Sequence, residues 1–185
     1  MLSTRLNWRS ARLLCCLLAL VVGSPAVWAF DDDIYGEGRW NKFEEGPAWK
    51  EQTVVLPPYP DEGELLEVDL DLGDFPFTFW IDPASLQVGE DRVVRYTGVL
   101  RSSTGVENVF YEGVRCSKKE YQRYAYGSGG VFKRLDNSTW RPVSSIGAER
   151  YRSVFMRDFL CPLPGFNREK QLLRRVKTPA LRPDF

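Results

Sequence analysis

The chain has no histidine, and its 185 residues include only two methionines and four cysteines. Without an imidazole it cannot form a Ser-His-Asp triad, a Cys-His dyad or a histidine-ligated zinc site. Its glycine-rich stretches, Gly36-Glu37-Gly38 and Gly127-Ser128-Gly129-Gly130, are not followed by the Lys-Ser/Thr pair of a nucleotide-binding loop. These absences exclude many hydrolase and nucleotide-binding sites, and we expect no cofactor.

Long apolar runs are also lacking. The run from Leu13 to Val22 holds ten residues, half of the ~20 that a membrane span needs. It follows a basic stretch and precedes Val27-Trp28-Ala29, which fits a signal peptidase site. We therefore expect residues 1–29 to be a signal peptide, a mature chain that begins at Phe30, and a periplasmic or secreted protein. No later segment is apolar enough to cross a membrane, so we expect no stable membrane insertion after cleavage.

Charge is balanced overall but divided along the mature chain. The stretch from Phe30 to Arg92 carries 17 acidic and 4 basic residues, whereas Val93 to Phe185 carries 8 acidic and 18 basic ones. A nucleic-acid-binding protein would have a marked basic excess, which argues against that class. The two halves either neutralise each other within one molecule or form two surfaces for different partners. The sequence favours the first arrangement and a monomer.

Residues 30–61 lack a sustained hydrophobic period. Leu56-Pro57-Pro58-Tyr59-Pro60 is incompatible with a helix or a central strand and is typical of polyproline II. Trp40, Trp49 and Tyr59 are nevertheless unusual in a free linker, because disordered segments are poor in aromatics. We predict an extended arm that these three aromatics anchor on the folded domain.

A series of short strands follows, separated by turns and spaced 8–15 residues apart. This spacing is typical of an antiparallel meander rather than of β-α-β units. The predicted strands are Leu66–Leu72, Phe77–Ile81 (ended by Asp82-Pro83), Arg92–Arg101, Val106–Cys116 and Tyr121–Tyr126, with a short ribbon of Val131–Lys133 and Thr139–Pro142.

The hydrophobic period changes to that of a helix near the C-terminus. Glu149–Leu160 places Tyr151, Val154, Phe155 and Phe159 on one face, with Arg150, Arg152 and Arg157 lying largely elsewhere. A second helix is predicted with Asn167 as its N-cap, burying Leu172, Leu173 and Val176. The expected fold is α+β: residues 62–178 form one domain whose C-terminal helices pack on one face of the sheet, and residues 179–185 are a tail.

Two cysteines, Cys116 and Cys161, are left once the signal peptide is removed. Since the periplasm is oxidising, two free thiols would be unusual there. Cys116 ends a predicted core-facing strand, and Cys161 ends the predicted helix that packs on it. We predict a disulfide that joins the helix to the sheet.

Glu112 is the carboxylate that stands out. Strand alternation places it on the same face as Phe110 and Val114, so it should be partly buried and must be paired or protonated. One interpretation is an ion pair with Arg95, Arg115 or an arginine of the C-terminal helices. The alternative is a general acid that works with Asp82 or Asp91 on a glycan.

Two further patterns suggest ligand sites. Asp69-x-Asp71-x-Gly73-Asp74 resembles the start of a calcium loop, but it has Asp74 in the glycine position and Trp80 in place of the bidentate glutamate. We therefore expect no metal site there. Tyr121, Tyr124 and Tyr126 cluster beside Arg123, and such aromatics either fill a core or form a ligand surface.

Four ordered stretches resemble the cryptic neisserial protein-like family of secreted bacterial proteins. They are Asp31-Asp32-Asp33-Ile34-Tyr35-Gly36-Glu37, Leu56-Pro57-Pro58-Tyr59-Pro60, the run from Ile81 to Thr97, and Asn108-Val109-Phe110-Tyr111-Glu112-Gly113-Val114-Arg115-Cys116. The resemblance spans roughly residues 31–161 and implies a Gram-negative envelope protein. It implies no activity, because the family brings no catalytic residues that could be assigned here.

The sequence favours a non-catalytic soluble periplasmic protein over an enzyme, with a role in binding or assembly in the cell envelope. Its partner would be an envelope protein or a glycan. One alternative is a hydrolase that uses carboxylates on cell-wall or polysaccharide glycans, and another is a calcium-stabilised adhesion module.

Overall fold

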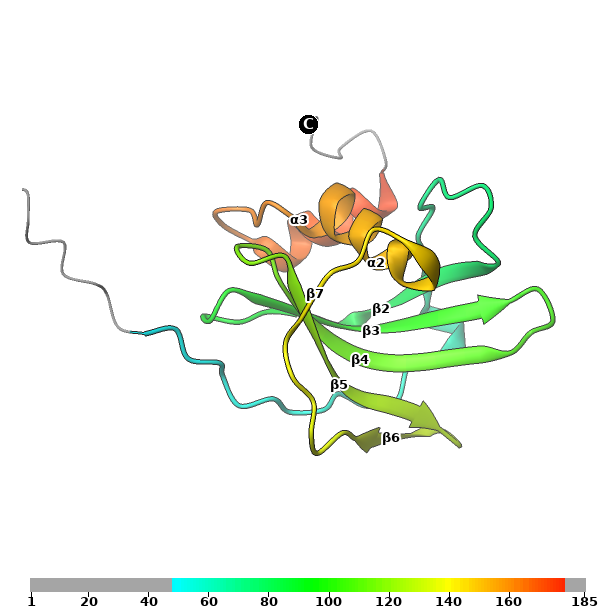
Figure 1. Cartoon of the computed structure of the whole chain (residues 1–185), viewed down its shortest axis with the longest axis horizontal. Helices are drawn as coiled ribbons and strands as arrows, with labels where there is room; N and C mark the ends of the chain where they lie inside the picture. Colours follow the sequence, from blue (N-terminus) through cyan, green and yellow to red (C-terminus); the bar gives the residue numbers. More distant parts are fainter. Residues whose placement is uncertain (1–47, 179–185) are drawn as a thin grey trace, which may run out of the picture. The chain divides into compact units, whose positions relative to one another are not determined.

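The computed structural model of the protein describes residues 48–178 (Figure 1). The predicted signal peptide, the arm before residue 48 with its anchor Trp40, and the tail at 179–185 lie outside the described residues. Within the described range, no helix is both long and apolar enough to span a membrane.

One antiparallel sheet dominates the described residues. Its strands lie side by side in the order in which they occur along the chain, from β1 to β6, and β7 pairs with β5 beside β6. The predicted antiparallel α+β meander is confirmed. The strands are β1 (Leu66–Glu67), β2 (Phe77–Val88), β3 (Val93–Ser102), β4 (Glu107–Arg115), β5 (Glu120–Ser128), β6 (Val131–Arg134) and β7 (Arg141–Pro142).

The first two strands differ from their predicted bounds. The expected strand at 66–72 keeps only two residues in the sheet, although Val68 and Leu70 remain buried. Strand β2 continues past Asp82-Pro83, where a strand end was predicted, and its register with β3 shifts between Asp82 and Gln87. A proline is tolerated at such an irregularity because the ladder needs no N–H donor there.

Two helical segments cover one face of the sheet (Figure 1). The predicted continuous helix at 149–160 is a 3₁₀ turn η3 (Gly147–Glu149), a short α2 (Arg150–Phe155) and a π-helical turn η4 (Met156–Leu160). Helix α3 (Arg168–Lys177) buries Leu172 and Val176 as predicted. Asn167 is the N-cap residue of α3, as predicted, although its φ is +44° and its side chain makes no capping hydrogen bond.

The main core lies between these helices and the sheet. Rings from the two layers meet there: Phe79 lies 4.9 Å from Phe155 and 5.2 Å from Tyr151 between ring centroids. Gly98 on β3 lies directly opposite Phe110 on β4. A Cβ at Gly98 would lie 2.6 Å from the Phe110 ring, so the core requires a glycine at this close approach.

The other face of the sheet is partly covered by the chain before β1, which runs without regular structure until the 3₁₀ turn η2 (Glu62–Glu64) (Figure 1). Trp49 donates its indole N–H to the Asp91 carbonyl oxygen at 2.9 Å. Further along, the Tyr59 ring lies 5.4 Å from Phe132 of β6. Two of the three predicted aromatic anchors therefore contact the domain.

A disulfide joins Cys116, just after β4, to Cys161, just after η4, with a Cα–Cα distance of 5.7 Å. The predicted link between sheet and helix is confirmed.

Ion pairs show how the acidic and basic halves of the chain are used. Of the nine ion pairs among the described residues, three cross from the acidic to the basic half, joining Arg95 to Glu51 and Asp91, and Arg150 to Asp74. The other six lie within the basic half. Among residues 48–178, neutralisation between the halves is therefore partial.

Candidate functional site

Glu112 lies at the centre of a buried polar cluster beneath helix α2. Both Glu112 and Arg152 are fully buried. One carboxylate oxygen of Glu112 accepts hydrogen bonds from the Tyr96 hydroxyl at 2.5 Å and from Arg152 Nε at 2.8 Å. The other accepts from Arg152 Nη2 at 3.0 Å and from Arg123 Nη2 at 3.2 Å. The carboxylate is thus saturated with donors.

Arg152 has further partners besides Glu112. It forms an ion pair with Glu149 and is fully buried. It also stacks on the Tyr121 ring, with its guanidinium carbon 3.7 Å from the ring centroid. Burial alone would lower the pKa of Arg152, but the charge and hydrogen bonds of Glu112, together with the nearby Tyr151 and Tyr96, outweigh burial and raise it. The cluster therefore contains two carboxylates, Glu112 and Glu149, and two arginines, Arg123 and Arg152. Their formal charges sum to zero.

The partner of Glu112 was foreseen only in part. An arginine of the C-terminal helices does bind it, whereas Arg95 and Arg115 pair with Asp91 and Glu120 instead. The expectation that Arg152 points away from the core is wrong. Its position follows from Glu112, since a buried carboxylate requires a buried cation.

The carboxylates considered for hydrolysis have separate hydrogen-bond partners. Asp82 accepts the backbone N–H of Ala84 at 2.9 Å, within its own turn. Asp91 forms an ion pair with Arg95 at 2.6 Å. Burial would raise the pKa of Asp91, but its hydrogen bonds from Arg95 and from two backbone N–H groups outweigh burial and lower it. Neither aspartate is bonded to the Glu112 cluster.

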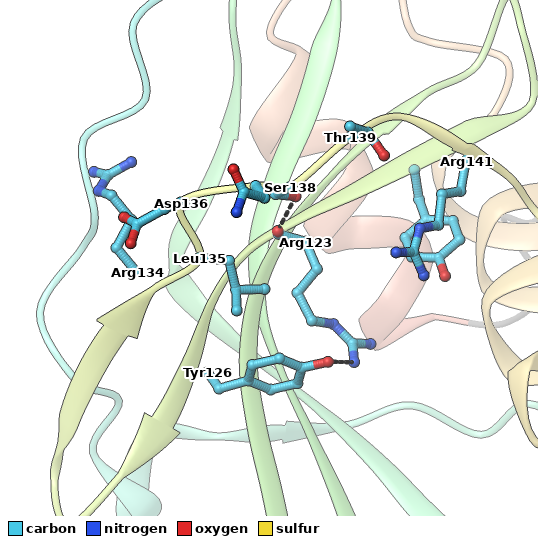
Figure 2. A pocket seen from close by; sticks show the side chains of 10 residues that line it. Arg123, Tyr126, Arg134, Leu135, Asp136, Ser138, Thr139 and Arg141 are labelled. Atoms are coloured by element: carbon cyan, nitrogen blue, oxygen red, sulfur yellow. Dashed lines mark hydrogen bonds between the residues drawn. The ribbon is translucent and has the colours of Figure 1, made fainter.

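A polar pocket of about 470 Å³ opens beside β5 (Figure 2). Its walls are side chains of β5 on one side and the connection between β6 and β7 on the other. The lining residues are Tyr121, Arg123, Tyr126, Arg134, Leu135, Asp136, Asn137, Ser138, Thr139 and Arg141.

Three strands each supply one arginine to this pocket: Arg123 from β5, Arg134 from β6 and Arg141 from β7. Arg123 Nη1 donates to the Tyr126 hydroxyl at 3.2 Å (Figure 2). Its Nη2 donates to the buried Glu112 at 3.2 Å. Asp136 is the single carboxylate in the lining. The pocket therefore carries a net positive charge, and its wall is continuous with the buried cluster through Arg123.

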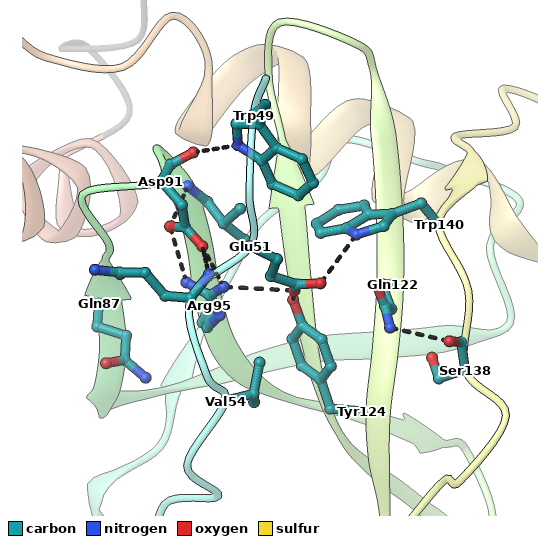
Figure 3. Close-up of polar contacts among 12 residues, drawn as sticks. Trp49, Glu51, Val54, Gln87, Asp91, Arg95, Gln122, Tyr124, Ser138 and Trp140 are labelled. Carbon is teal, nitrogen blue, oxygen red and sulfur yellow. Dashed lines mark hydrogen bonds and ion pairs between the residues drawn. The ribbon is translucent and has the colours of Figure 1, made fainter. Parts of the chain in front are cut away.

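The three tyrosines singled out in the sequence separate in the structure. Tyr121 and Tyr126 line the pocket. Tyr124 instead donates its hydroxyl to Glu51 at 2.5 Å (Figure 3). Its ring packs against that of Tyr111. The register of β4 and β5 shifts between Tyr111 and Glu112. Such a bulge breaks simple alternation, so Tyr121 and Tyr126 lie on the same face although they are five residues apart, and Tyr124 does not join them.

The polar group around Glu51 holds the N-terminal segment (Figure 3). The Glu51 carboxylate accepts hydrogen bonds from Tyr124, Arg95 and the Trp140 indole. Arg115 lies 4.2 Å from the Trp49 ring centroid and 5.2 Å from that of Trp140. Both carboxylate oxygens of Glu51 have protein partners here, so we assign this group to stability.

The resemblance to a calcium loop has a local explanation. Asp69 accepts the backbone N–H of Asp71 at 2.9 Å, a turn that the chain makes by itself. Among residues 48–178, no group of three or more His, Cys, Asp or Glu side chains could hold a metal ion.

Sequence reasoning missed most of the pocket. Arg134 and Arg141 were not singled out, nor was the connection between them. The available signal was the run Asp136-Asn137-Ser138-Thr139, which places four short polar side chains between two basic strands. A run of this kind is also typical of an ordinary loop, so the sequence alone does not show that it lines a pocket.

The fold and pocket define an α+β protein whose antiparallel meander carries C-terminal helices on one face and an arginine-lined pocket beside its fifth strand. The CNP1-like family model matches residues 44–177. The chain belongs to this family, as the resemblance predicted.

A curated relative is "Cryptic neisserial protein 1" of Neisseria gonorrhoeae (strain ATCC 700825 / FA 1090). It is 26% identical over 152 residues, which cover 71% of this chain and 74% of the relative. No solved structure matches the chain.

Proposed function

We propose that this protein is a non-catalytic, exported binding protein of the cell envelope, and that the pocket beside β5 binds the carboxylate groups of an acidic glycan. The observation that carries the proposal is the convergence of Arg123, Arg134 and Arg141 with Tyr121 and Tyr126 around one cavity. Each element of this lining has a counterpart in the chemistry of a uronic acid.

Guanidinium groups bind carboxylates in a two-pronged geometry, and arginine is preferred wherever such planar anions are recognised. Aromatic rings provide an apolar face for a sugar ring, and hydroxyl and amide side chains such as Asn137, Ser138 and Thr139 provide hydrogen bonds. A cavity of about 470 Å³ lies within the usual range for small-molecule sites.

The lining also explains why we propose binding without catalysis. A glycosidase needs two carboxyl groups about 5–5.5 Å or about 6.5–9.5 Å apart across the scissile bond. This pocket offers Asp136 alone among its lining residues, and Glu112 behind it is fully bonded to Tyr96 and two arginines.

Export and a monomeric state belong to the same proposal. They are supported by the signal-like stretch at residues 1–29, by the disulfide, which is typical of oxidising compartments, and by the partial neutralisation of the two halves within one chain.

Isothermal titration of the mature protein with trigalacturonate tests this function, with neutral maltotriose as the control sugar. We expect saturable binding of the acidic sugar only. Arg141→Gln should weaken it about tenfold, the effect of one lost charge-assisted hydrogen bond. The Arg141 side chain makes no ion pair with the described residues, so the fold should be unaffected.

Lys133→Gln is the matched control, because Lys133 is an exposed cation of β6 that does not line the pocket. It should leave the affinity unchanged. Equal binding of both sugars, no binding of trigalacturonate, or wild-type affinity of Arg141→Gln would refute the proposal.

A further inference from the structure

A second cavity lies at the disulfide and shares no residue with the pocket beside β5. Its volume is about 740 Å³. The floor is mainly carbon and sulfur, from Met156, Leu163, Pro162 and the Cys116–Cys161 disulfide. The rim is basic, with Arg92, Lys119 and Arg157, and no carboxylate lines the cavity. We call it the disulfide groove.

The cations of the rim differ in their availability. Arg157 is bonded to Asp158 at 2.5 and 2.9 Å. Arg92 and Lys119, by contrast, make no side-chain ion pair or hydrogen bond with the described residues. Two cations beside an apolar floor therefore lack an anion.

The backbone at these two cations is unusual as well. Arg92 has a φ of +63° and Lys119 a φ of +54°, and both are left-handed conformations that favour glycine or asparagine. Glycine would adopt these conformations more easily, so the backbone geometry of the turns does not explain why Arg92 and Lys119 are cationic residues. Non-glycine residues held in such conformations cluster at functional sites.

We infer that the disulfide groove binds a single-chain anionic amphiphile, a fatty acid in its simplest form. The acyl chain would lie on Met156, Leu163 and the disulfide, while Arg92 and Lys119 would hold the carboxylate at the rim. Transfer of each CH₂ group from water to such a floor is favourable, and the two unpaired cations complement one anionic head. This inference is independent of the function proposed for the β5 pocket.

An acidic peptide of a partner protein is the other candidate with this charge. Peptides that bind in extended form pair with a free strand edge, which supplies a row of backbone donors and acceptors. The groove lies instead between turns at the ends of strands, at Arg92 and Lys119, and the segment from Ser153 to Leu163. No strand edge runs along it, so the observations favour the amphiphile.

Calorimetric titration of the mature protein with laurate, below the concentration at which it forms micelles, tests the inference. Dodecyltrimethylammonium, which has the same chain length and the opposite charge, is the control ligand. We expect saturable binding of one laurate per chain and no comparable binding of the cation.

Lys119→Gly is the informative variant, because glycine adopts the left-handed conformation freely. It should weaken laurate binding about tenfold without lowering the melting temperature. Lys118→Gly is the matched control: Lys118 lies in the same turn but does not line the groove, and its loss should leave laurate affinity unchanged.

Three results would overturn the inference: equal binding of the two amphiphiles, wild-type laurate affinity of Lys119→Gly, or failure of laurate to bind while an acidic apolar peptide binds in a Lys119-dependent way. Arg141→Gln should leave laurate affinity unchanged, so failure here remains distinguishable from failure of the glycan proposal.

Discussion

Glu112 is a carboxylate in the core, and its environment determines what its substitution would do. Moving an ion pair from water into the core costs desolvation free energy, which can exceed the attraction between the two charges. A buried ion pair is therefore no evidence that it stabilises the fold. Removal of one partner, however, leaves the other charge buried and uncompensated. In this cluster Arg152 is fully buried and Arg123 is partly buried, with 18% of its side chain exposed.

We therefore expect Glu112→Gln to lower the free energy of unfolding by about 3–5 kcal/mol. Urea unfolding measures this loss. Glu107→Gln is the control: Glu107 lies on the same strand and pairs with Arg101 at 2.6 Å, but both side chains are partly exposed. Such a pair contributes about 0–1 kcal/mol. Equal losses from the two substitutions would contradict a buried charge cluster.

The lowered pKa of Asp91 leads us to predict that the stability of the fold depends on pH. Its pKa is lower in the folded protein than in the unfolded chain, because its bonds from Arg95 and from backbone N–H groups outweigh burial. The stability that it contributes is present above its unfolded pKa and is lost as the pH falls below about 4.

Asp91→Asn should therefore be less stable than the natural protein at pH 7, and the difference should shrink at pH 3. Unfolding midpoints in urea at the two pH values measure it. A difference that stays constant between pH 7 and pH 3 would show that the Asp91 charge does not stabilise the fold.

At the scale of single residues, the sequence predicted which residues are buried better than it predicted which residues they bind. Alternation along β4 placed Glu112 inside, because a period of two needs only local backbone geometry. The position of Arg152 was not predictable in this way, since a helical pattern treats a charge as exposed until its buried partner is known. The separation of Tyr124 from Tyr121 and Tyr126 was not predictable either, because the bulge in β5 has no clear signature in the sequence.

At the scale of elements, the N-terminal segment is held by a few aromatic and polar contacts. Trp140 donates to Glu51 at 3.2 Å, and its ring lies 5.9 Å from that of Trp49, with Arg115 beside both. These contacts replace the ladder hydrogen bonds that a strand would have had.

We expect Trp140→Ala to increase amide hydrogen exchange at residues 49–54 while the strands stay protected, because local opening follows the loss of local contacts. Exchange monitored by mass spectrometry checks this. Trp80→Ala is the control, since Trp80 stacks on Arg101 away from the segment, at 5.3 Å. Unchanged exchange at residues 49–54 in Trp140→Ala would argue against this anchor.

The disulfide is the second link between elements. It closes a loop with a sequence separation of 45 residues. In the chain-entropy account, a loop of this size contributes about 4 kcal/mol by restricting the unfolded chain. The double substitution Cys116→Ser and Cys161→Ser should lower the free energy of unfolding by up to this amount, as measured with urea. A wild-type melting temperature would contradict a stabilising bridge.

The order of the strands was predictable because each one has its own period-two pattern and its own turn. The π-helical turn at 156–160 and the passage of β2 through Pro83 were not, because both depend on what the backbone packs against. The β5 pocket was predictable only through Tyr121, Arg123 and Tyr126, since Arg134 and Arg141 come from two other strands that spacing alone does not bring beside β5.

At the scale of the whole molecule, the two faces of the sheet have different roles. The helix face holds the main core and, at its edge beside β5, the arginine-lined pocket (Figures 1 and 2). The opposite face is partly covered by the N-terminal segment and its polar group (Figure 3). Glu112 joins core and pocket, because Arg123 contacts the buried carboxylate and the pocket at once.

The account rests on the pocket as the place where an acidic glycan binds, and one measurement addresses it directly. Backbone amide chemical shifts of the mature, isotope-labelled protein would be followed during titration with trigalacturonate. The account predicts that the largest changes fall on residues 121–126 and 134–141 and that maltotriose produces none of comparable size. An absence of changes, or changes that centre on Arg92 and Lys119 or on the Glu51 group instead, would contradict it.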